Sequence, residues 1–308
     1  MTDAPSDRAR RLLRGAFDTH IHVDPDVVPR IVDDLTLARR FLELGMDGFV
    51  LKSHYTATAE RARVVSAAVP GITALGAIVL NRAVGGLNPL AVEVAARAGA
   101  RTVWLPTVDS VNESHERDAI GSRPPATVPV WVRLQRDLRE QGIEIEPVPV
   151  VDAAGAVLPE LVAVLERVAR HGLLLATGHL DRDEIFAVVD AARDAGITQI
   201  VITHPEFPAQ SLGLDDQRAL AQRGALLERC MTTPHTGKIA WEQWIENIRA
   251  CGPESSVLST DLGQTFNPPV QDGMAIMVDR LLAAGFTDEE VHVMAVTNTR
   301  RVAGVDPW

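Results

Sequence analysis

Short apolar runs typical of buried strands recur along the chain, and each precedes a stretch whose apolar residues are spaced three or four apart. Several of these stretches end in glycine, the residue that favours the left-handed backbone after a helix. Strands alternating with helices, at a pitch near the roughly 30 residues of a βαβ unit, indicate a parallel sheet. The strand-like runs are 16–22, 47–54, 72–80, 101–107, 173–179, 199–204, 225–230 and 256–261.

Eight such units predict an α/β fold, a closed (β/α)₈ barrel of the TIM type, and we expect residues 1–308 to form one domain. The pitch is interrupted after the fourth strand, which predicts an insertion over about 108–160. This insertion should contain a Pro-rich loop, a helix over 130–141 and a hairpin over 144–158. A doubly wound open sheet is the alternative, but it gives no reason for eight evenly spaced units, and no GxGxxG motif follows the first strand.

Composition narrows the class of protein. The net charge is −11 and the basic residues are scattered, which argues against nucleic acid or an anionic membrane as the main partner. Cys230 and Cys251 form no disulfide framework or zinc-finger spacing. No secretory signal or bilayer-spanning apolar run is present in the sequence. We therefore expect a cytoplasmic protein that acts on a small molecule, either as a monomer or as a homo-oligomer.

Polar residues suited to metal binding stand at the ends of the strand-like runs. His20 and His22 are one residue apart, so on a strand both imidazoles point to one face, about 7 Å apart. Neutral imidazole binds Zn²⁺ and related cations well near neutral pH. The carboxyl ends of barrel strands converge on the face where active sites are built. The full set at these ends is His20, His22, Lys52, His54, His179, His204 and Asp261.

Taken singly, His179 or His204 is explained as well by a place in the core as by metal binding. Together with His20 and His22 at neighbouring strand ends, they predict a metal centre. Divalent ions lower the pKa of water and polarise a carbonyl oxygen, and Asp261 could take and deliver the proton. Hydrolysis of an amide, cyclic amide or imide, lactone or ester bond follows. A nucleophilic Cys230 lacks a histidine partner in the sequence, and no Gly-x-Ser-x-Gly elbow occurs.

The motifs Phe-Asp-Thr-His-Ile-His (17–22), Ala-Thr-Gly-His (176–179), Val-Ile-Thr-His-Pro (201–205) and Leu-Ser-Thr-Asp (258–261) resemble those of the amidohydrolase superfamily of metal-dependent barrel hydrolases. The tail over 295–304 is similar to the closing helix of that superfamily, so the resemblance covers nearly the whole chain. It implies His20 and His22 on one metal, and His179 and His204 on a second or near the first. It also implies that Asp261 is both a ligand and the general base. We expect one or two divalent ions, with zinc first among the metals that such ligands accept.

Lys52 marks a departure from the superfamily. Many binuclear members bridge their metals with a carbamylated lysine or a glutamate at the end of strand 4, where this chain has Trp104-Leu105-Pro106-Thr107. Inward side chains of alternate barrel strands share layers, so Lys52 on strand 2 can reach the same level. We expect Lys52 to supply the bridge as a carbamate. Otherwise it stays an ammonium that orients an anionic substrate or pairs with Asp261.

Residues near the strand ends are candidates for substrate contact, and His54 could instead be a further metal ligand. The candidates are His54, Tyr55, Arg82, Glu228 and His235. Two other functions stay open. A metal-dependent non-oxidative decarboxylase of the same superfamily needs one ion and no bridge, so an unmodified Lys52 would favour it. A vestigial barrel that only binds a ligand is the second, although the intact set of potential ligands argues against decay.

Overall fold

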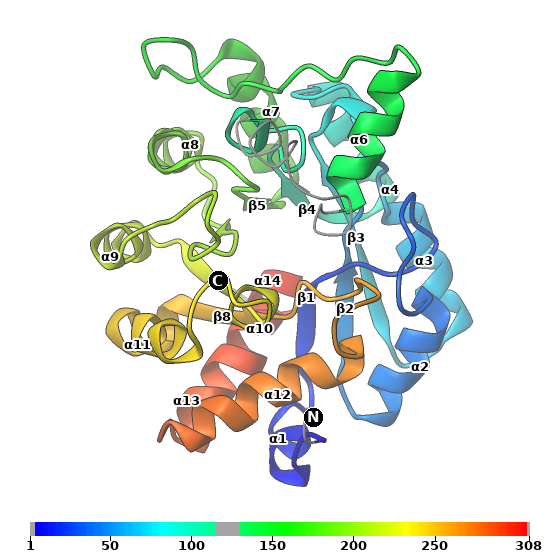
Figure 1. Ribbon diagram of the computed structural model, residues 1–308, viewed down its shortest axis with the longest axis vertical. Coiled ribbons are helices and arrows are strands. Elements are labelled where there is room, and N and C mark those ends of the chain that lie inside the picture. Colours follow the sequence, from blue (N-terminus) through cyan, green and yellow to red (C-terminus); the bar gives the residue numbers. More distant parts are fainter. Residues whose placement is uncertain (1–3, 115–129, 307–308) are drawn as a thin grey trace.

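The computed structural model describes residues 4–114 and 130–306, and it confirms the predicted (β/α)₈ barrel. Its strands pair in parallel in chain order from β1 to β8. Figure 1 shows the strands inside a ring of helices. The strands are β1 (Phe17–Ile21), β2 (Gly48–Leu51), β3 (Thr73–Val79), β4 (Ala100–Trp104), β5 (Leu174–Ala176), β6 (Ile200–Ile202), β7 (Leu226–Cys230) and β8 (Ser256–Ser259).

The helices lie outside the strands in the order that the sequence predicts. Those of the barrel wall are α2 (Asp34–Glu43), α3 (Ala59–Ala68), α4 (Pro89–Ala98), α7 (Pro159–His171), α8 (Arg182–Asp194), α9 (Leu214–Gln222), α11 (Trp241–Cys251) and α12 (Val270–Ala283). The others are α1 (Asp7–Leu12), α6 (Val130–Glu140), α10 (Thr232–His235), α13 (Asp288–His292), a π-helical segment (Val293–Thr297) and α14 (Asn298–Ala303). None of the helices in the described ranges combines the length and apolar character needed to span a bilayer.

Closure of the barrel between β8 and β1 brings distant parts of the chain together. Just beyond β8, the Asp261 amide donates to the His20 carbonyl (2.8 Å), and the His22 amide donates to the Leu262 carbonyl (2.8 Å). The buried Asp18 carboxylate accepts from the Thr260 amide (3.0 Å) and hydroxyl (2.6 Å). The seam therefore sets Asp261 beside the two histidines of β1.

The expected insertion after β4 is formed only in part. Its helix is present as α6, whereas the hairpin expected over 144–158 forms only around its turn, where the Leu158 amide donates to the Val150 carbonyl (3.0 Å) and the Asp152 amide donates to the Ala156 carbonyl (2.8 Å). Within these residues, the structure has a turn closed by one antiparallel bridge between Val151 and Val157, and Val148 instead bridges to Ser110. Pro147 and Pro149 have no N–H to donate to a ladder, which explains why no hairpin extends past them. The part of the Pro-rich loop over 115–129 lies outside the described residues.

A capping box begins α8 three residues after His179. The Glu184 amide donates to the Asp181 carboxylate and the Asp181 amide donates to the Glu184 carboxylate, each at 2.9 Å. Glu184 is 7% exposed, and burial raises its pKa to about 7. The capping box therefore fixes the start of α8 after β5, but it holds the Glu184 carboxyl group where water solvates its charged form poorly.

Glu184→Gln should stabilise the protein at alkaline pH. The pKa of Glu184 rises from 4.5 to about 7 on folding. Glu184 therefore leaves the free energy of unfolding unchanged below pH 4.5 and lowers it as the pH rises from 4.5 through 7. Glutamine preserves the capping box without a charge. In urea unfolding, the variant should match the wild type at pH 4 and exceed it at pH 8 by up to about 3 kcal/mol. The exposed neighbour variant Asp183→Asn is the control, and equal gains at both pH values would contradict the argument.

Candidate metal centre

Three potential ligand atoms meet at the carboxyl end of β1. His20 and His22 are buried, with ring centroids 5.4 Å apart. Asp261 Oδ1 lies 3.1 Å from His20 Nε2 and 3.2 Å from His22 Nε2. Asp261 has a φ of 52°, an uncommon backbone conformation outside glycine, and the Thr232 hydroxyl donates to its Oδ2 (2.9 Å). Two imidazole nitrogens and one carboxylate oxygen converge on one point, a donor set that fits zinc and similar divalent ions.

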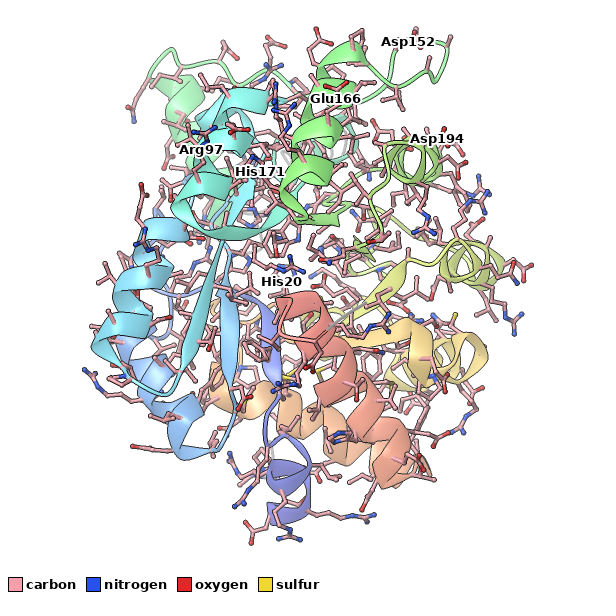
Figure 2. All side chains as sticks on the ribbon, turned by 180° about the vertical axis from the view of Figure 1, so that it is seen from behind. His20, Arg97, Asp152, Glu166, His171 and Asp194 are labelled. Atoms are coloured by element: carbon pink, nitrogen blue, oxygen red, sulfur yellow. The ribbon has the colours of Figure 1, made fainter. Side chains whose placement is uncertain are left out.

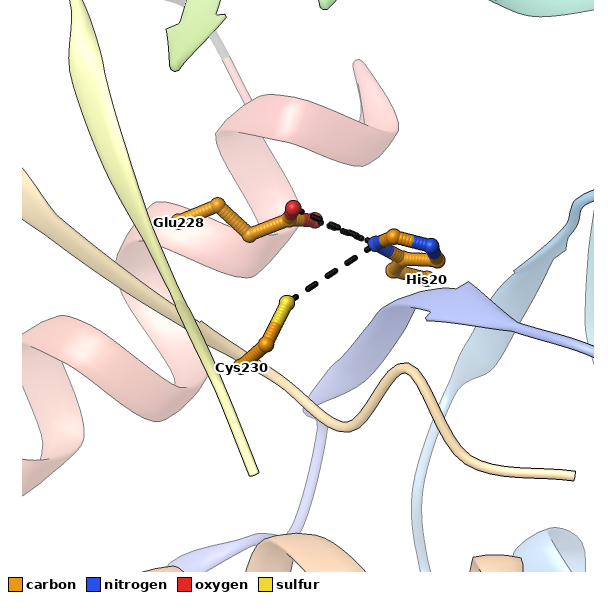
Figure 3. A group of neighbouring side chains, drawn as sticks. All are labelled: His20, Glu228 and Cys230. Carbon is orange, nitrogen blue, oxygen red and sulfur yellow. Dashed lines mark hydrogen bonds and ion pairs between the residues drawn. The ribbon is translucent and has the colours of Figure 1, made fainter. Parts of the chain in front are cut away.

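Glu228 and Cys230 lie behind His20, as Figure 3 shows. Both carboxylate oxygens of Glu228 lie 3.2 Å from His20 Nδ1, and Cys230 Sγ lies 3.8 Å from the same atom. Burial raises the pKa of Glu228, but His20 and other cationic groups outweigh it and lower the pKa to about 2. Glu228, which the sequence offered as a substrate contact, is 2% exposed and holds His20 from the rear.

The electrostatics of His20 point to a site that favours positive charge. Burial and Lys52 lower the pKa of His20, but Glu228 and Asp261 together raise it to about 9. The two carboxylates thus stabilise a positive charge on or next to this imidazole. A divalent cation between His20, His22 and Asp261 would satisfy the same two carboxylates.

His179 and His204 follow β5 and β6 and lie next to the first pair. Their ring centroids are 4.9 Å apart, and the His204 ring is 6.1 Å from that of His20. Nδ1 of His179 lies 2.7 Å from Glu113 Oε1, and Nδ1 of His204 lies 3.1 Å from Gln210 Oε1. The structure therefore brings together all four histidines that the sequence assigned to metal binding.

Most of these imidazoles are kept neutral, the form that binds cations. Burial is the largest cause that lowers the pKa of His22, His54, His179 and His204, and neighbouring cationic groups lower it further. For His22, the next cause is Arg30, whose Nη2 lies 3.4 Å from His22 Nδ1. Arg30 is itself paired with Asp26 (2.6 Å).

Lys52 points into the same cluster from β2. Its Nζ lies 2.9 Å from His20 Nε2 and 5.2 Å from the centroid of the Trp104 ring, at the end of β4. Lys52 is 3% exposed, and burial is the largest cause that lowers its pKa. Strand 4 thus contributes an indole where many binuclear barrels have a bridging group, and the amine of Lys52 stands over it.

The remaining substrate-contact candidates differ in position. The His54 ring stacks on His22 with centroids 4.9 Å apart, and the Tyr55 ring is 6.1 Å from that of His54. The Tyr55 hydroxyl is buried and has no hydrogen-bond partner among residues 4–114 and 130–306. Arg82 is exposed, and its guanidinium donates to the Glu146 and Pro147 carbonyls (2.7 and 2.6 Å), which ties down the segment before Val148.

His235 ends α10 and forms no hydrogen bond or ring contact with the site histidines within the described part of the chain. Figure 2 places His20 near the middle of the molecule, whereas the other labelled residues lie above it in that view. Sequence reasoning missed several groups that contact the histidines: Asn81 and Thr107 stand at strand ends but are not ionisable, and the other three lie outside the strands. These groups are Arg30, Asn81, Thr107, Glu113 and Gln210.

Comparison with solved structures supports the resemblance at the level of the fold. An amidohydrolase from Pseudomonas aeruginosa matches with 11% identity over 98% of this chain and 99% of that one, with a TM-score of 0.62. The probable dipeptidase PvdM from the same organism matches with 11% identity over 96% of both chains, with a TM-score of 0.62. A Burkholderia multivorans amidohydrolase with bound zinc matches with 11% identity over 94% and 99%, with a TM-score of 0.56. These solved structures and this chain share the (β/α)₈ barrel fold.

At the level of sequence, no curated protein matches the chain. One family model does, over residues 15–228, a range that contains β1 to β6, most of the site histidines and Lys52, and ends at Glu228. The model describes DUF6282, a family of unknown function. The match covers well over half of the chain, so the chain belongs to the DUF6282 family.

Proposed function

We propose that this protein is a metal-dependent hydrolase that cleaves an amide, cyclic amide or imide, lactone or ester bond of a small molecule. The observation that carries the proposal is the convergence of His20 Nε2, His22 Nε2 and Asp261 Oδ1 at the end of β1. These residues would hold a divalent ion, for which zinc is our first choice, with His179 and His204 as further ligands of that ion or of a second. Two unpaired cysteines fit a cytoplasmic enzyme.

When bound, such an ion supplies Lewis acidity, which lowers the pKa of water and polarises a carbonyl oxygen. Asp261 is placed to act as the general base, since Thr232 fixes its Oδ2 while Oδ1 faces the histidines. Glu228 fixes the orientation of His20 through Nδ1, as carboxylates behind metal-binding histidines do. The His54 ring and the Tyr55 hydroxyl, which has no hydrogen-bond partner in the described part of the chain, are the groups that we expect to bind the substrate.

The experiment is a comparison of metal-free and reconstituted protein on a panel of amides, cyclic imides, lactones and aryl esters. We expect turnover of at least one bond class, lost by about 10³-fold or more after chelation and recovered with zinc or manganese. A Burkholderia multivorans homologue in fold binds zinc, which supports zinc as the first metal to test. Turnover that survives complete metal removal would rule the proposal out.

Lys52 is proposed as a carbamate that bridges two ions. The lowered pKa of Lys52 favours the neutral amine, the form that adds carbon dioxide, and its Nζ is 2.9 Å from His20 Nε2. We expect Lys52→Ala to bind one fewer equivalent of zinc than the wild type, measured by plasma mass spectrometry after dialysis. Carbon-13 NMR of protein equilibrated with labelled bicarbonate should show a carbamate signal that this variant lacks. A variant that retains every equivalent would exclude the bridge.

A second candidate, a non-oxidative decarboxylase, is favoured by one observation. The donor atoms of His20, His22 and Asp261 converge on a single point, and β4 ends in Trp104 where a bridging group stands in many binuclear enzymes. One zinc equivalent, an unmodified Lys52 and release of carbon dioxide from an aromatic or unsaturated acid would together select this function over hydrolysis.

A further inference from the structure

We propose that Asn81 and Thr107 hold His54 in one tautomer, with the proton on Nε2, so that His54 donates a hydrogen bond to the substrate and is not a metal ligand. The inference rests on the proposed function, because it takes the cluster of histidines as the place that holds zinc and binds the substrate. It is argued from a chain of three buried or half-buried side chains whose donors and acceptors can be assigned one after another.

The orientation of the Asn81 amide is fixed by two backbone groups. Its Oδ1 accepts from the Thr107 amide N–H (2.8 Å), and its Nδ2 donates to the His54 carbonyl (2.9 Å). A flipped amide would set a donor against a donor and an acceptor against an acceptor. Asn81 is fully buried, so water cannot relieve such a conflict. Nδ2 is therefore the atom that lies 2.8 Å from Thr107 Oγ1, and it donates to that hydroxyl.

The Thr107 hydroxyl then has a proton of its own to place. Thr107 is fully buried, and its Oγ1 has two partners among the described residues, Asn81 Nδ2 and His54 Nδ1. Asn81 Nδ2 is a donor, so His54 Nδ1, at 2.8 Å, is the group that can accept the hydroxyl proton. The opposite choice would leave a buried O–H without an acceptor, which costs about 1–3 kcal/mol.

A neutral imidazole that accepts at Nδ1 carries its proton on Nε2. His20 differs at Nδ1, because there Nδ1 faces an acceptor, the Glu228 carboxylate, and therefore carries a proton. A ring with a proton on Nε2 and a hydrogen bond on Nδ1 has no free electron pair for a metal ion. The hydroxyl of Thr107 thereby separates His54 from the ligand histidines that surround it.

The position of the His54 ring indicates which part of the substrate it would contact. It stacks on His22 (4.9 Å between centroids, 25° between planes), and its centroid lies 6.2 Å from that of His179. An N–H donor beside two metal-binding residues is suited to an oxygen of the substrate near the reacting bond. We infer that the substrate presents a carbonyl or carboxylate oxygen to His54, while Thr107 and Asn81 act as positioning residues.

The test is two-bond proton–nitrogen NMR of zinc-loaded protein labelled at the histidine nitrogens, with the His54 signals assigned by their loss in His54→Gln. We expect a single Nε2–H pattern for His54 in the wild type. In Thr107→Val, this pattern should be replaced by a mixture of tautomers or by the Nδ1–H form. Thr107→Ser keeps the hydroxyl and should retain the wild-type pattern. An Nδ1–H pattern in the wild type would overturn the inference.

Metal content gives an independent readout that needs no turnover. His54→Asn should retain the zinc stoichiometry of the wild type, whereas His179→Asn should lose zinc. Loss of zinc from His54→Asn with its fold intact by circular dichroism would also overturn the inference. On any substrate found in the panel, Thr107→Val should raise KM about tenfold and Thr107→Ser by much less. If the panel yields no substrate, the proposed function fails, whereas the tautomer of His54 is still decided by the NMR measurement.

Discussion

Asp261→Asn is expected to lower kcat/KM by about 10³-fold and to weaken zinc binding. The carboxylate contacts both His20 and His22, at 3.1 and 3.2 Å, and the pKa of Asp261 is held well below its usual range. Burial opposes this lowering, but His20 and His22 outweigh it. Asparagine has nearly the same shape but cannot take a proton from water and is a poor metal ligand. Initial rates on the best substrate of the panel and zinc titration measure the two effects.

The control for this variant is Asp190→Asn, which removes an exposed carboxylate paired with Arg223 on the outer helices. It should leave both rate and zinc affinity within about twofold of the wild type. An Asp261→Asn protein that keeps its fold and more than a tenth of the wild-type rate would remove Asp261 from the role of general base.

Glu206→Gln is expected to destabilise the protein by about 3–5 kcal/mol. Arg229 is fully buried between the barrel and its helices, and its Nη1 contacts Glu206 Oε1 and lies 2.7 Å from Gln217 Oε1. Glutamine can still accept a hydrogen bond but leaves the buried guanidinium without a counter-charge. Equilibrium urea unfolding measures the loss. Glu206 lies two residues after His204, so local loosening should also weaken zinc binding.

Asp216→Asn is the matched control, because it breaks a pair with the half-exposed Arg182 on the surface (2.7 Å). Exposed pairs contribute little, so the loss should stay below about 1 kcal/mol. Equal losses of unfolding free energy in the two variants would show that burial does not determine how much the Arg229–Glu206 pair contributes to stability.

The barrel and the gathering of the strand-end histidines could be predicted from the sequence because both follow from local patterns. Each strand is a short apolar run, and the polar residue that follows it lands on the catalytic face by the geometry of a parallel barrel. His20, His179, His204 and Asp261 carry this signal directly, and the structure brings them together.

The residues behind the histidines could not be predicted in the same way. Glu113 and Gln210 lie in loops, and their contacts with His179 and His204 depend on the path of those loops. Glu228, by contrast, lies on a strand, and its alternation with Arg229 carries a signal. Side chains two apart on a strand share a face, so Glu228 and Cys230 point to His20 while Arg229 points outward to Gln217.

The shortness of the hairpin has a different cause. Alternating apolar residues near Pro147 and Pro149 read as a strand, but the prolines remove the N–H groups that a ladder needs. The alternation of apolar side chains therefore predicts a longer strand than the proline backbone allows. The same segment is instead held by Arg82, whose guanidinium donates hydrogen bonds to the carbonyls of Glu146 and Pro147.

The central claim is that His20 and His22 hold a divalent ion with Asp261. Equilibrium dialysis of metal-free protein against zinc, followed by metal analysis, tests it most directly when the double variant His20→Ala/His22→Ala is measured beside the wild type. The account predicts at least one tightly held equivalent in the wild type and its loss in a double variant that remains folded. A wild-type protein that binds no zinc, manganese or iron, or a double variant that keeps the metal, would contradict it.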